Sequence, residues 1–579
     1  MKNIVAFFIG CCCSLGLSAQ VKTKSTVDIV LKNIEIFDRQ QSKADSISGY
    51  VLGSLSESYF ERRYQFYKQQ HTILNSADTS KISFDEQINR ELLNYIIDEE
   101  LSSWTYKEYL NPILADEGFH TSLAHRSSRQ FSGKKDAIAY LRFLNDIPHY
   151  TEQNLALMRK GLALGISQPR IILNGYENTY NQHIVNNIDS SVFWKPFITK
   201  PYSITEADWD SIKAAARLSI QSNVIPAFKS IQQFFDTEYL PKTRTTLGAS
   251  YFPDGKNFYE EKARHYTTTN LGSEAIYQIG LTEVERIQNE MNAVIKGVGF
   301  KGDFKAFINF LRTDPQFYAP TAEQLLKEAS YIAKKADGML PSLFGKLPRQ
   351  PYGVAPVPAF LAPTYTSGRY SGSSIRSKNA GHYWVNTYNL KSRTLYTLES
   401  LTLHEAVPGH HLQTALAQEL DHLPDFRRNL YINVFGEGWG LYGEFLGYEM
   451  GFYKDPYSRF GRLTYDMWRA CRLVIDVGIH TKNWTREQAV AYLADHTALS
   501  IHEVNTEINR YISWPGQALA YKIGELRIRQ LRSKAEAVLK EKFDVRDFHD
   551  VVLSQGSVTL GVLEKMVDRY ISKVQAGKK

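Results

Sequence analysis

Apolar residues recur at intervals of three and four positions along most of this 579-residue chain, for example in residues 88–101 and 155–164. This spacing places apolar side chains on one face of an α-helix, where they can pack on neighbouring helices. Thr282 and Glu285 have the spacing of a capping box, which predicts that a helix begins there. The sequence therefore predicts a mainly α-helical protein, long enough to bury a large core.

The helical pattern is interrupted near the middle of the chain, where six prolines fall within residues 341–363. Residues 381–387 follow with a composition typical of a β-strand, and a helix is predicted from Arg393 to His404. We therefore expect a small β-sheet beside this helix. The interruption divides the mature chain into a helical region of residues 21–340 and a second one of residues 341–579, which we expect to form one unit around a deep central groove.

The N-terminus has the pattern of a secretory signal peptide over residues 1–20. Lys2 precedes an apolar run from Ile4 to Leu17, and small residues end the run at Ser18 and Ala19. The run is too short for a membrane span. An exported protein, periplasmic or secreted, is therefore predicted, with no transmembrane span after signal removal. A lipidated form, anchored through Cys11, is the second interpretation.

Composition excludes several other classes of protein. The net charge is only +7 and no block of Lys and Arg stands out, so binding to nucleic acid is not expected. Cys471 is the one cysteine beyond the predicted signal peptide, so the mature chain has no internal disulfide and depends on core burial for stability. Its helical, apolar surroundings predict a buried packing residue rather than a nucleophile.

A metal-binding pattern occurs at the end of the helix predicted before residue 405. His404 followed directly by Glu405 is half of the HExxH signature, in which a second histidine four residues on binds the same zinc ion. The fourth position here is Pro408, which offers no metal ligand. The next two histidines are His410 and His411.

The proline and the glycine after it provide a way to bring two histidines together. In a straight helix His410 would lie about 9 Å along the axis from His404, too far to share an ion with bonds of about 2.0–2.1 Å. Pro408 breaks the helical hydrogen bonding, and Gly409 tolerates nearly any backbone angle. We predict a bulge that absorbs two residues and places His410 beside His404. A bulge of three residues would bring His411 there instead.

The pattern His-Glu-x-x-Pro-Gly-His-His-x-Gln resembles a bacterial family of unknown function, DUF885, many members of which are classed as lipoproteins. Further matching segments are residues 280–282, 311–314, 436–439 and 510–518. The resemblance covers most of the mature chain. It implies a helical zincin-like fold, similar to the Taq-type metallocarboxypeptidases and more distantly to angiotensin-converting enzyme, but it implies no established substrate.

The resemblance also implies that the third metal ligand is an acidic residue on a later helix, and Glu437 fits this position. The glycines around it allow that helix to approach the metal helix closely. Glu444 lies seven residues on, roughly on the same helix face, and is expected in a second layer around the metal. His411 is expected there too if His410 is the ligand.

The expected chemistry is hydrolysis of a peptide bond with one Zn²⁺ ion. Three protein ligands leave zinc a position for water, whose pKa the metal lowers. Glu405 is the expected general base. Related enzymes stabilise the oxyanion with His or Tyr near the C-terminal end, and Tyr511 is the first candidate here, before Tyr521. A site with two histidines and one glutamate also accepts Mn²⁺ or Co²⁺.

A peptide substrate is the expected partner, and three residues are predicted to contact it. Asn386, just after the predicted strand, can hold the substrate backbone, to which zincins commonly add a strand. Arg369 can bind a substrate carboxylate, which would indicate a carboxypeptidase, and Tyr521 is expected in the same groove. The alternatives are a zinc amidohydrolase acting on a non-peptide amide, a peptide-binding protein of this fold without catalysis, and a helical protein without metal.

Overall fold

The computed structural model describes residues 25–76, 78–359 and 361–577. The predicted signal peptide therefore lies outside the described residues. Helices of the region before residue 344 are α1 (Thr26–Ser48), α2 (Glu57–Asn75), α3 (Phe84–Thr105), α4 (Thr121–His125), α5 (Lys134–Ala163), α6 (Asn178–Asn181), α7 (Glu206–Ser219), α8 (Ile225–Phe234), α9 (Gly255–Thr267), α10 (Ser273–Gly297), α11 (Phe304–Thr313) and α12 (Ala322–Leu343).

The C-terminal half of the chain contains the sheet and the remaining helices. The strands are β1 (Tyr352–Pro356), β2 (Gly368–Ser371) and β3 (Gly381–Val385). The helices are α13 (Leu398–Glu405), α14 (His410–Gln418), α15 (Asp425–Arg428), α16 (Asn433–Leu446), α17 (Pro456–Thr481), α18 (Arg486–His496), α19 (Ile501–Ser513), α20 (Ala520–Leu539), α21 (Val545–Leu553) and α22 (Leu560–Gln575). The prediction of a mainly α-helical fold with a small sheet near the metal helix is confirmed.

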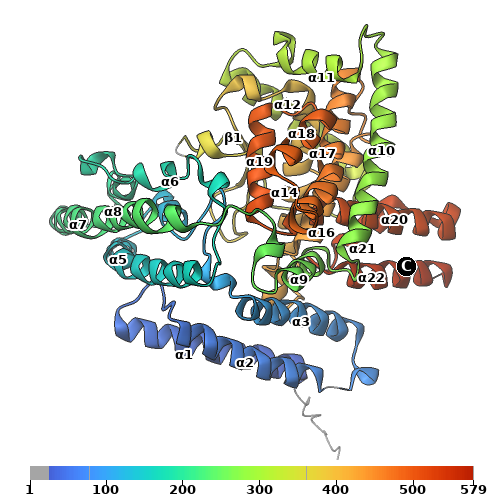
Figure 1. The fold of residues 1–579 in the computed structure, drawn as a ribbon. Helices are drawn as coiled ribbons and strands as arrows, with labels where there is room; N and C mark the ends of the chain where they lie inside the picture. The colour runs from blue at the N-terminus through green and yellow to red at the C-terminus, as the bar shows by residue number, and fades with distance from the viewer. Residues whose placement is uncertain (1–24, 77, 360, 578–579) are drawn as a thin grey trace, which may run out of the picture.

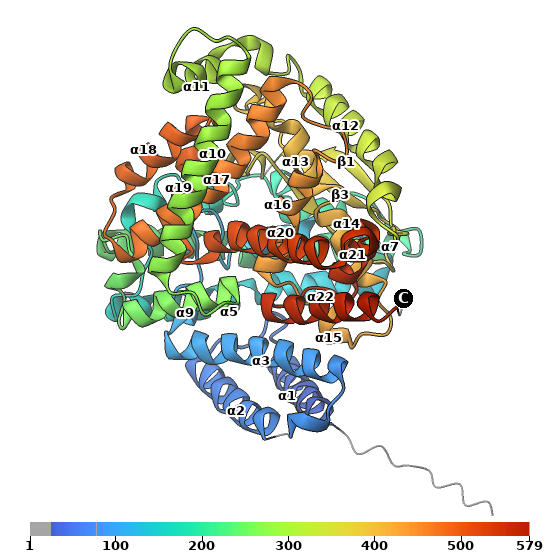
Figure 2. The ribbon, with the colours of Figure 1, turned by 90° about the vertical axis from the view of Figure 1, so that its right-hand side faces the viewer.

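The helices form a base, a side wing and a central bundle. Helices α1, α2 and α3 lie side by side at the bottom of both ribbon views (Figures 1 and 2). Helices α5, α7 and α8 form the wing on the left of Figure 1, and the bundle around α16 and α17 lies on the right. One apolar core cluster includes residues from both halves of the chain, from Ile88 in α3 to Ile571 in α22.

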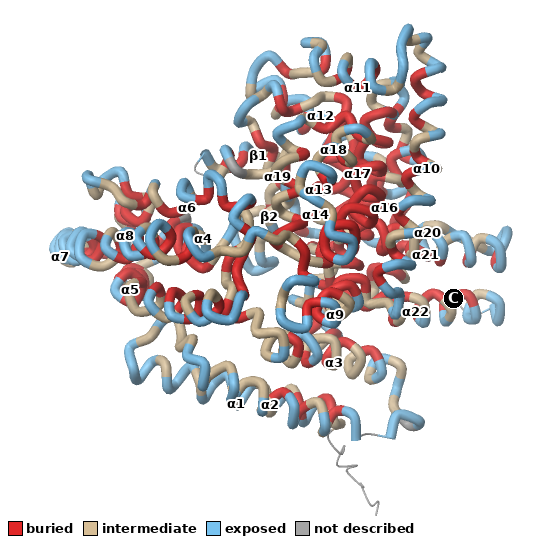
Figure 3. Tube along the Cα trace, in the orientation of Figure 1, coloured by how far each residue is buried: buried red, intermediate tan, exposed pale blue. Residues whose placement is uncertain are grey.

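Helix α17 is the centre of the bundle. All of its residues from Phe460 to His480 are buried, and it is among the densely buried segments in Figure 3. Helix α10 packs along it, and the close approach is made at Gly280, where an added Cβ would lie 2.8 Å from the Cβ of Leu473. Cys471 is buried in this helix as a free thiol, as its apolar surroundings predicted.

Helix α10 corrects one prediction. Thr282 does not cap a helix, because α10 begins nine residues earlier, at Ser273, and continues through this position. The Thr282 hydroxyl donates to the carbonyl of Gln278 at 3.0 Å, a bond typical of a threonine inside a helix. The capping-box spacing was fulfilled by chance, since packing of the long helix on α17 outweighs the local preference.

The three strands form a mixed sheet with the order β1-β3-β2. Strand β3 pairs in parallel with β1 and antiparallel with β2, with Tyr383 opposite both Val354 and Tyr370. The short strand β2 is therefore an edge strand, and it packs against α13. The helix predicted from residue 393 begins five residues later, at Leu398, after two short 3₁₀ turns.

Among the residues that the structure describes, no helix is both long enough and apolar enough to span a membrane.

Candidate metal centre

The signature segment forms two helices separated by a tight turn. Helix α13 ends at Glu405 and α14 begins at His410. The turn contains the proline and Gly409, whose backbone N–H donates to the carbonyl of Leu403 at 3.0 Å. A Cβ on Gly409 would lie only 1.9 Å from the carbonyl oxygen of His404, so no larger residue fits here. The turn removes the helical spacing that would keep the two histidines apart.

Three side chains converge beside this turn. The Nε2 atoms of His404 and His410 lie 3.5 and 3.4 Å from Oε2 of Glu437. The two imidazole rings are nearly perpendicular, with centroids 4.7 Å apart. Within the described part of the chain, these are the residues of types suited to a metal whose ligand atoms all lie within 4.8 Å of one another. The structure brings together the three residues predicted as ligands, with His410 rather than His411.

The glycines of α16 allow the third residue to reach this position. A Cβ on Gly440 would lie 2.7 Å from Cε1 of His404, so α16 touches the imidazole with its backbone. On another side of α16, Gly438 faces Gly524 of α20, and a Cβ there would lie 2.6 Å from its backbone. The indole of Trp439 donates to the carbonyl of Pro408 at 2.8 Å. Helix α16 is thus held against both the metal turn and α20.

The buried carboxylates fix the orientation and charge of the histidines. Nδ1 of His404 lies 2.9 Å from Oε1 of the fully buried Glu444, as expected for a residue behind a metal ligand. Burial lowers the pKa of His404, but hydrogen bonds to Glu437 and Glu444 outweigh it and raise the pKa to about 10. Burial opposes ionisation of Glu437, yet His410 and His404 hold its pKa well below the usual range. The Tyr431 hydroxyl donates to Oε1 of Glu437 at 3.0 Å.

Glu405 points to the same region without joining the three converging side chains. Its Oε2 accepts the backbone N–H of Tyr370 at 2.7 Å, and the residue is 7% exposed. His411 faces elsewhere: its Nδ1 lies 3.0 Å from the Tyr370 hydroxyl, and its ring packs on Tyr352. Burial lowers the pKa of His411 to about 4. His411 therefore supports the sheet beside the centre rather than the metal ligands.

Two predicted contacts with substrate differ from the structure. Asn386 is fully buried, and its amide donates to the carbonyls of Ala362, Tyr365 and Thr366, so it holds the loop before β2 and has no free donor for a substrate. Strand β3 is flanked by β1 and β2, so neither of its edges can add a strand. The edge strand beside α13 is β2, and its Tyr370 N–H faces Glu405.

The prediction for Tyr511 also differs from its placement. Its hydroxyl accepts the indole N–H of Trp468 at 2.7 Å and Nε of Arg472 at 2.8 Å. The residue is 1% exposed and does not line the cavity beside the metal centre. Tyr511 therefore anchors the arginine within the core, whereas Tyr521 and Arg369 do line that cavity.

The cavity beside the converging side chains has a volume of about 490 Å³. Its lining includes His404, Glu405, His410, Glu437 and residues of β2, α17 and α19. A neighbouring cavity of about 500 Å³ shares Thr366, Arg369 and Tyr370 with it. Together the two cavities match the deep groove that the sequence predicted.

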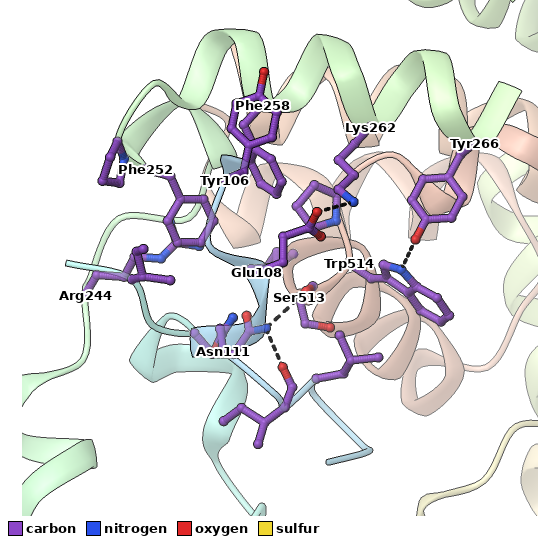
Figure 4. Close-up of a pocket in the computed structure, with 17 residues that line it drawn as sticks. Tyr106, Glu108, Asn111, Arg244, Phe252, Phe258, Lys262, Tyr266, Ser513 and Trp514 are labelled. Carbon is purple, nitrogen blue, oxygen red and sulfur yellow. Dashed lines mark hydrogen bonds and ion pairs between the residues drawn. The ribbon is translucent and has the colours of Figure 1, made fainter. Parts of the chain in front are cut away.

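A smaller cavity of about 140 Å³ lies behind Trp514, which lines this cavity as well as the one at the metal centre. Figure 4 shows its two polar contacts: Lys262 pairs with Glu108 at 2.6 Å, and Trp514 donates its indole N–H to the Tyr266 hydroxyl at 2.6 Å. These bonds fix the indole at the junction of the two cavities.

Sequence reasoning missed several residues of the cavity. Tyr431 is separated from Glu437 by six positions and precedes α16, so no helical spacing connected the two. Arg469 and Arg472 offered a clearer signal, because charged residues three positions apart in an otherwise apolar helix must be buried with a purpose. The backbone N–H of Tyr370 leaves no trace in a sequence.

A mainly helical fold, with two histidines and a glutamate converging beside a further glutamate, defines this chain as a helical protein with a candidate metal centre. The chain belongs to the family described as "Bacterial protein of unknown function (DUF885)", whose model matches residues 45–567. The resemblance drawn from the sequence is thereby confirmed. No curated protein matches the chain.

Two solved structures are similar to this one. A protein from Colwellia psychrerythraea, titled "putative lipoprotein", is 28% identical with a TM-score of 0.81, over 89% of this chain and 92% of that one. A protein from Shewanella oneidensis, titled a "putative lipoprotein of unknown function", is 17% identical with a TM-score of 0.68, over 94% and 100% of the two chains. The second likeness concerns the fold alone.

Proposed function

We propose that this protein is a zinc-dependent hydrolase of peptide bonds. The observation that carries the proposal is the convergence of His404, His410 and Glu437 beside the carboxylate of Glu405. Tetrahedral zinc with bonds of about 2.0–2.1 Å separates its ligand atoms by about 3.3–3.4 Å. The distances of 3.5 and 3.4 Å from Glu437 to the two histidines fit this geometry.

The donor set fits a catalytic rather than a structural zinc site. Two imidazoles and one carboxylate are three ligands, the number found where zinc keeps a position for water. Glu444 accepts the Nδ1 proton of His404, which leaves Nε2 for the ion. A zinc ion bound here would polarise the substrate carbonyl and lower the pKa of water.

Glu405 supplies the base for this reaction. The Tyr370 N–H fixes one oxygen of its carboxylate, at 2.7 Å, and leaves the other to accept a proton from the attacking water. The same carboxylate then passes the proton to the leaving amine. Its low exposure keeps bulk solvent from competing for this position.

The surroundings favour a peptide as substrate. Strand β2 is the edge of its sheet, and the Tyr370 N–H shows that this edge faces Glu405. An extended peptide can lie along such an edge, with its side chains in the two cavities that meet at β2. Cavities of about 490 and 500 Å³ accommodate several residues of a peptide.

Metal analysis and peptide cleavage test this proposal together. Protein purified without added metal is expected to contain about one zinc ion per chain, and to cleave members of a mixed peptide library followed by mass spectrometry. A chelator should stop the cleavage and zinc should restore it. Zinc-loaded protein that cleaves no peptide in the library would contradict the proposed activity, and protein that binds no zinc would contradict the centre itself.

We also infer that the protein is exported, in a secreted or lipid-anchored form. The supporting observations are the signal-like pattern of residues 1–20 and the titles of the two solved relatives. Mass spectrometry of the mature N-terminus distinguishes the two forms. Cleavage after Ala19 or Gln20 indicates secretion, and a lipid on Cys11 indicates an anchor.

A further inference from the structure

Four arginines line the cavity of the metal centre, and the hydrolysis proposed above uses none of them. Arg369 comes from β2, Arg469 and Arg472 from α17, and Arg510 from α19. We call these four residues the arginine cluster. Arg369 and Arg510, from opposite sides of the cavity, are close enough for their charges to interact. Bringing like charges together around a cavity costs free energy unless an anion joins them.

The acidic residues of the cavity only partly neutralise the arginine cluster. Outside the three converging side chains and Glu405, the lining contains two carboxylates, Glu503 and Glu507, against four guanidinium groups. Glu507 is shared, because it accepts from Arg472 at 2.8 Å and from Arg510 at 3.2 Å. Burial opposes its ionisation, but the charges of Arg510 and Arg472 dominate and lower its pKa to about 2. One carboxylate thus serves two arginines.

The other partners of the arginine cluster are weak or already occupied. Arg469 lies 3.4 Å from Glu444, which also holds His404. Arg369 lies 4.0 Å from Glu117, and both side chains are more than half exposed, so solvent screens this pair. Nη1 of Arg472 is buried without a hydrogen-bond partner among the described residues. The arginine cluster therefore keeps a positive excess.

Tyr521 carries this excess to the surface of the cavity. Its hydroxyl accepts Nη2 of Arg510 at 3.1 Å, and the guanidinium of Arg472 lies 3.9 Å from the centre of its ring. A hydroxyl that accepts from a cation has its own hydrogen left to donate. Tyr521 also lies close enough to Tyr431 for their charges to interact, and Tyr431 bonds to Glu437. The donors are thus within the reach of a substrate at the metal centre.

We propose that Arg510, Tyr521 and Arg369 form a subsite for a carboxylate of the substrate, with Arg472 fixing the ring of Tyr521. A guanidinium and a hydroxyl at a desolvated wall are donors that a carboxylate accepts and a neutral amide satisfies less well. The natural source is the C-terminal carboxylate of a peptide, so that the bond near the chain end is cleaved. This inference rests on the proposed peptidase function, and its test does not require turnover.

Binding to an inactive variant tests the subsite. The zinc-loaded Glu405→Gln protein is titrated calorimetrically with three probes: acetyl-Ala-Ala-Phe as free acid, its C-terminal amide, and acetyl-Ala-Asp-Phe amide. The free acid is expected to bind at least tenfold more tightly than its amide. Tight binding of the aspartyl amide instead would identify a side-chain carboxylate as the source. Equal affinities for all three, or no binding of any, would overturn the carboxylate subsite.

Variants locate the effect. Arg510→Gln and the milder Tyr521→Phe, each in the Glu405→Gln background, should bring the acid-to-amide affinity ratio towards one. Arg349→Gln is the matched control, because this arginine pairs with Glu419 on the surface and is absent from the cavity lining. A ratio that survives in both cavity variants would refute these residues as the subsite.

The outcomes separate this inference from the proposed function. If the free acid is preferred in the Glu405→Gln protein but the unmodified protein cleaves no peptide, the carboxylate subsite holds and the peptidase function fails. If the unmodified protein cleaves peptide acids and amides equally well, the peptidase function holds and the subsite fails.

Discussion

The backbone N–H of Tyr370 donates to Oε2 of Glu405 at 2.7 Å, and this bond joins the edge of the sheet to the proposed base. The residue that removes the proton is therefore positioned by the strand along which a substrate would lie. Any substitution that keeps an acceptor at this oxygen should preserve the arrangement while changing its chemistry.

Glu405→Gln is the substitution that meets this condition. The amide oxygen can still accept from Tyr370, but it cannot take a proton from water. We expect zinc content to remain at that of the unmodified protein and peptide cleavage to fall by at least about 100-fold, the usual contribution of a general base. Zinc analysis and cleavage rates on the same sample check this. Near-normal cleavage would eliminate Glu405 as the base.

Glu444→Gln should weaken zinc binding without removing a ligand. The carboxylate is fully buried and holds Nδ1 of His404 at 2.9 Å. Loss of such a partner typically lowers metal affinity by about 10–100-fold. Competition with a chromophoric chelator measures the change. Glu449→Gln, in a residue that pairs with Arg532 on the surface, is the control and should leave the affinity unchanged.

Gly440→Ala should displace His404. The added Cβ would lie 2.7 Å from Cε1 of the ring, which is bonded on its far side to Glu444 and cannot easily shift. We expect weaker zinc binding and lower stability. Gly338→Ala is the matched control in an exposed stretch of α12 with no atom within 4 Å of the added Cβ, and it should stabilise by about 0.5–1 kcal/mol. Equal behaviour of the two variants in zinc titration and urea unfolding would argue against the close contact.

His480 predicts loss of stability in acid. Its Nδ1 accepts the N–H of Ala249 and its Nε2 donates to the carbonyl of Tyr511, so only the neutral ring satisfies both bonds. Burial lowers its pKa from 6.5 to about 3. The unfolded chain therefore binds a proton between these values and the folded chain does not, so the stability contributed by His480 is complete above pH 6.5 and decreases as the pH falls towards 3.

Urea unfolding at several pH values between 4 and 7 measures this slope. His480→Gln lacks the titrating ring and should reduce the slope by about 1.4 kcal/mol per pH unit. Other buried histidines, such as His549, contribute slopes of their own, so the comparison with the unmodified protein is essential. An unchanged slope in the variant would show that His480 does not titrate differently on folding.

The ligand residues were accessible to sequence reasoning because their signals are local. His404 and Glu405 are adjacent, and a proline with a glycine has few ways to continue a helix, which led to His410. Glu437 depended on the family resemblance and on the glycines around it. All of these signals concern backbone geometry within a few residues, which a sequence expresses directly.

The residues that contact substrate were harder to predict because tertiary packing decides their exposure. Asn386 and Tyr511 have suitable chemistry, but the first is consumed by a loop and the second by Trp468 and Arg472. Strand β3 matched the expected composition, yet its place in the middle of the sheet was set by β2, which is only four residues long. Strand order depends on contacts between distant segments, which no local pattern encodes.

The contact between Gly438 and Gly524 has a consequence for any attempt to dissect the molecule. A fragment ending near residue 515 would retain both histidines and Glu437, yet it would lack the surface of α20 on which α16 rests. The signature segment is therefore not a transplantable module. Its affinity for a cation is a property of nearly the whole polypeptide, and shortened versions would report on damage to the scaffold rather than on the ligands.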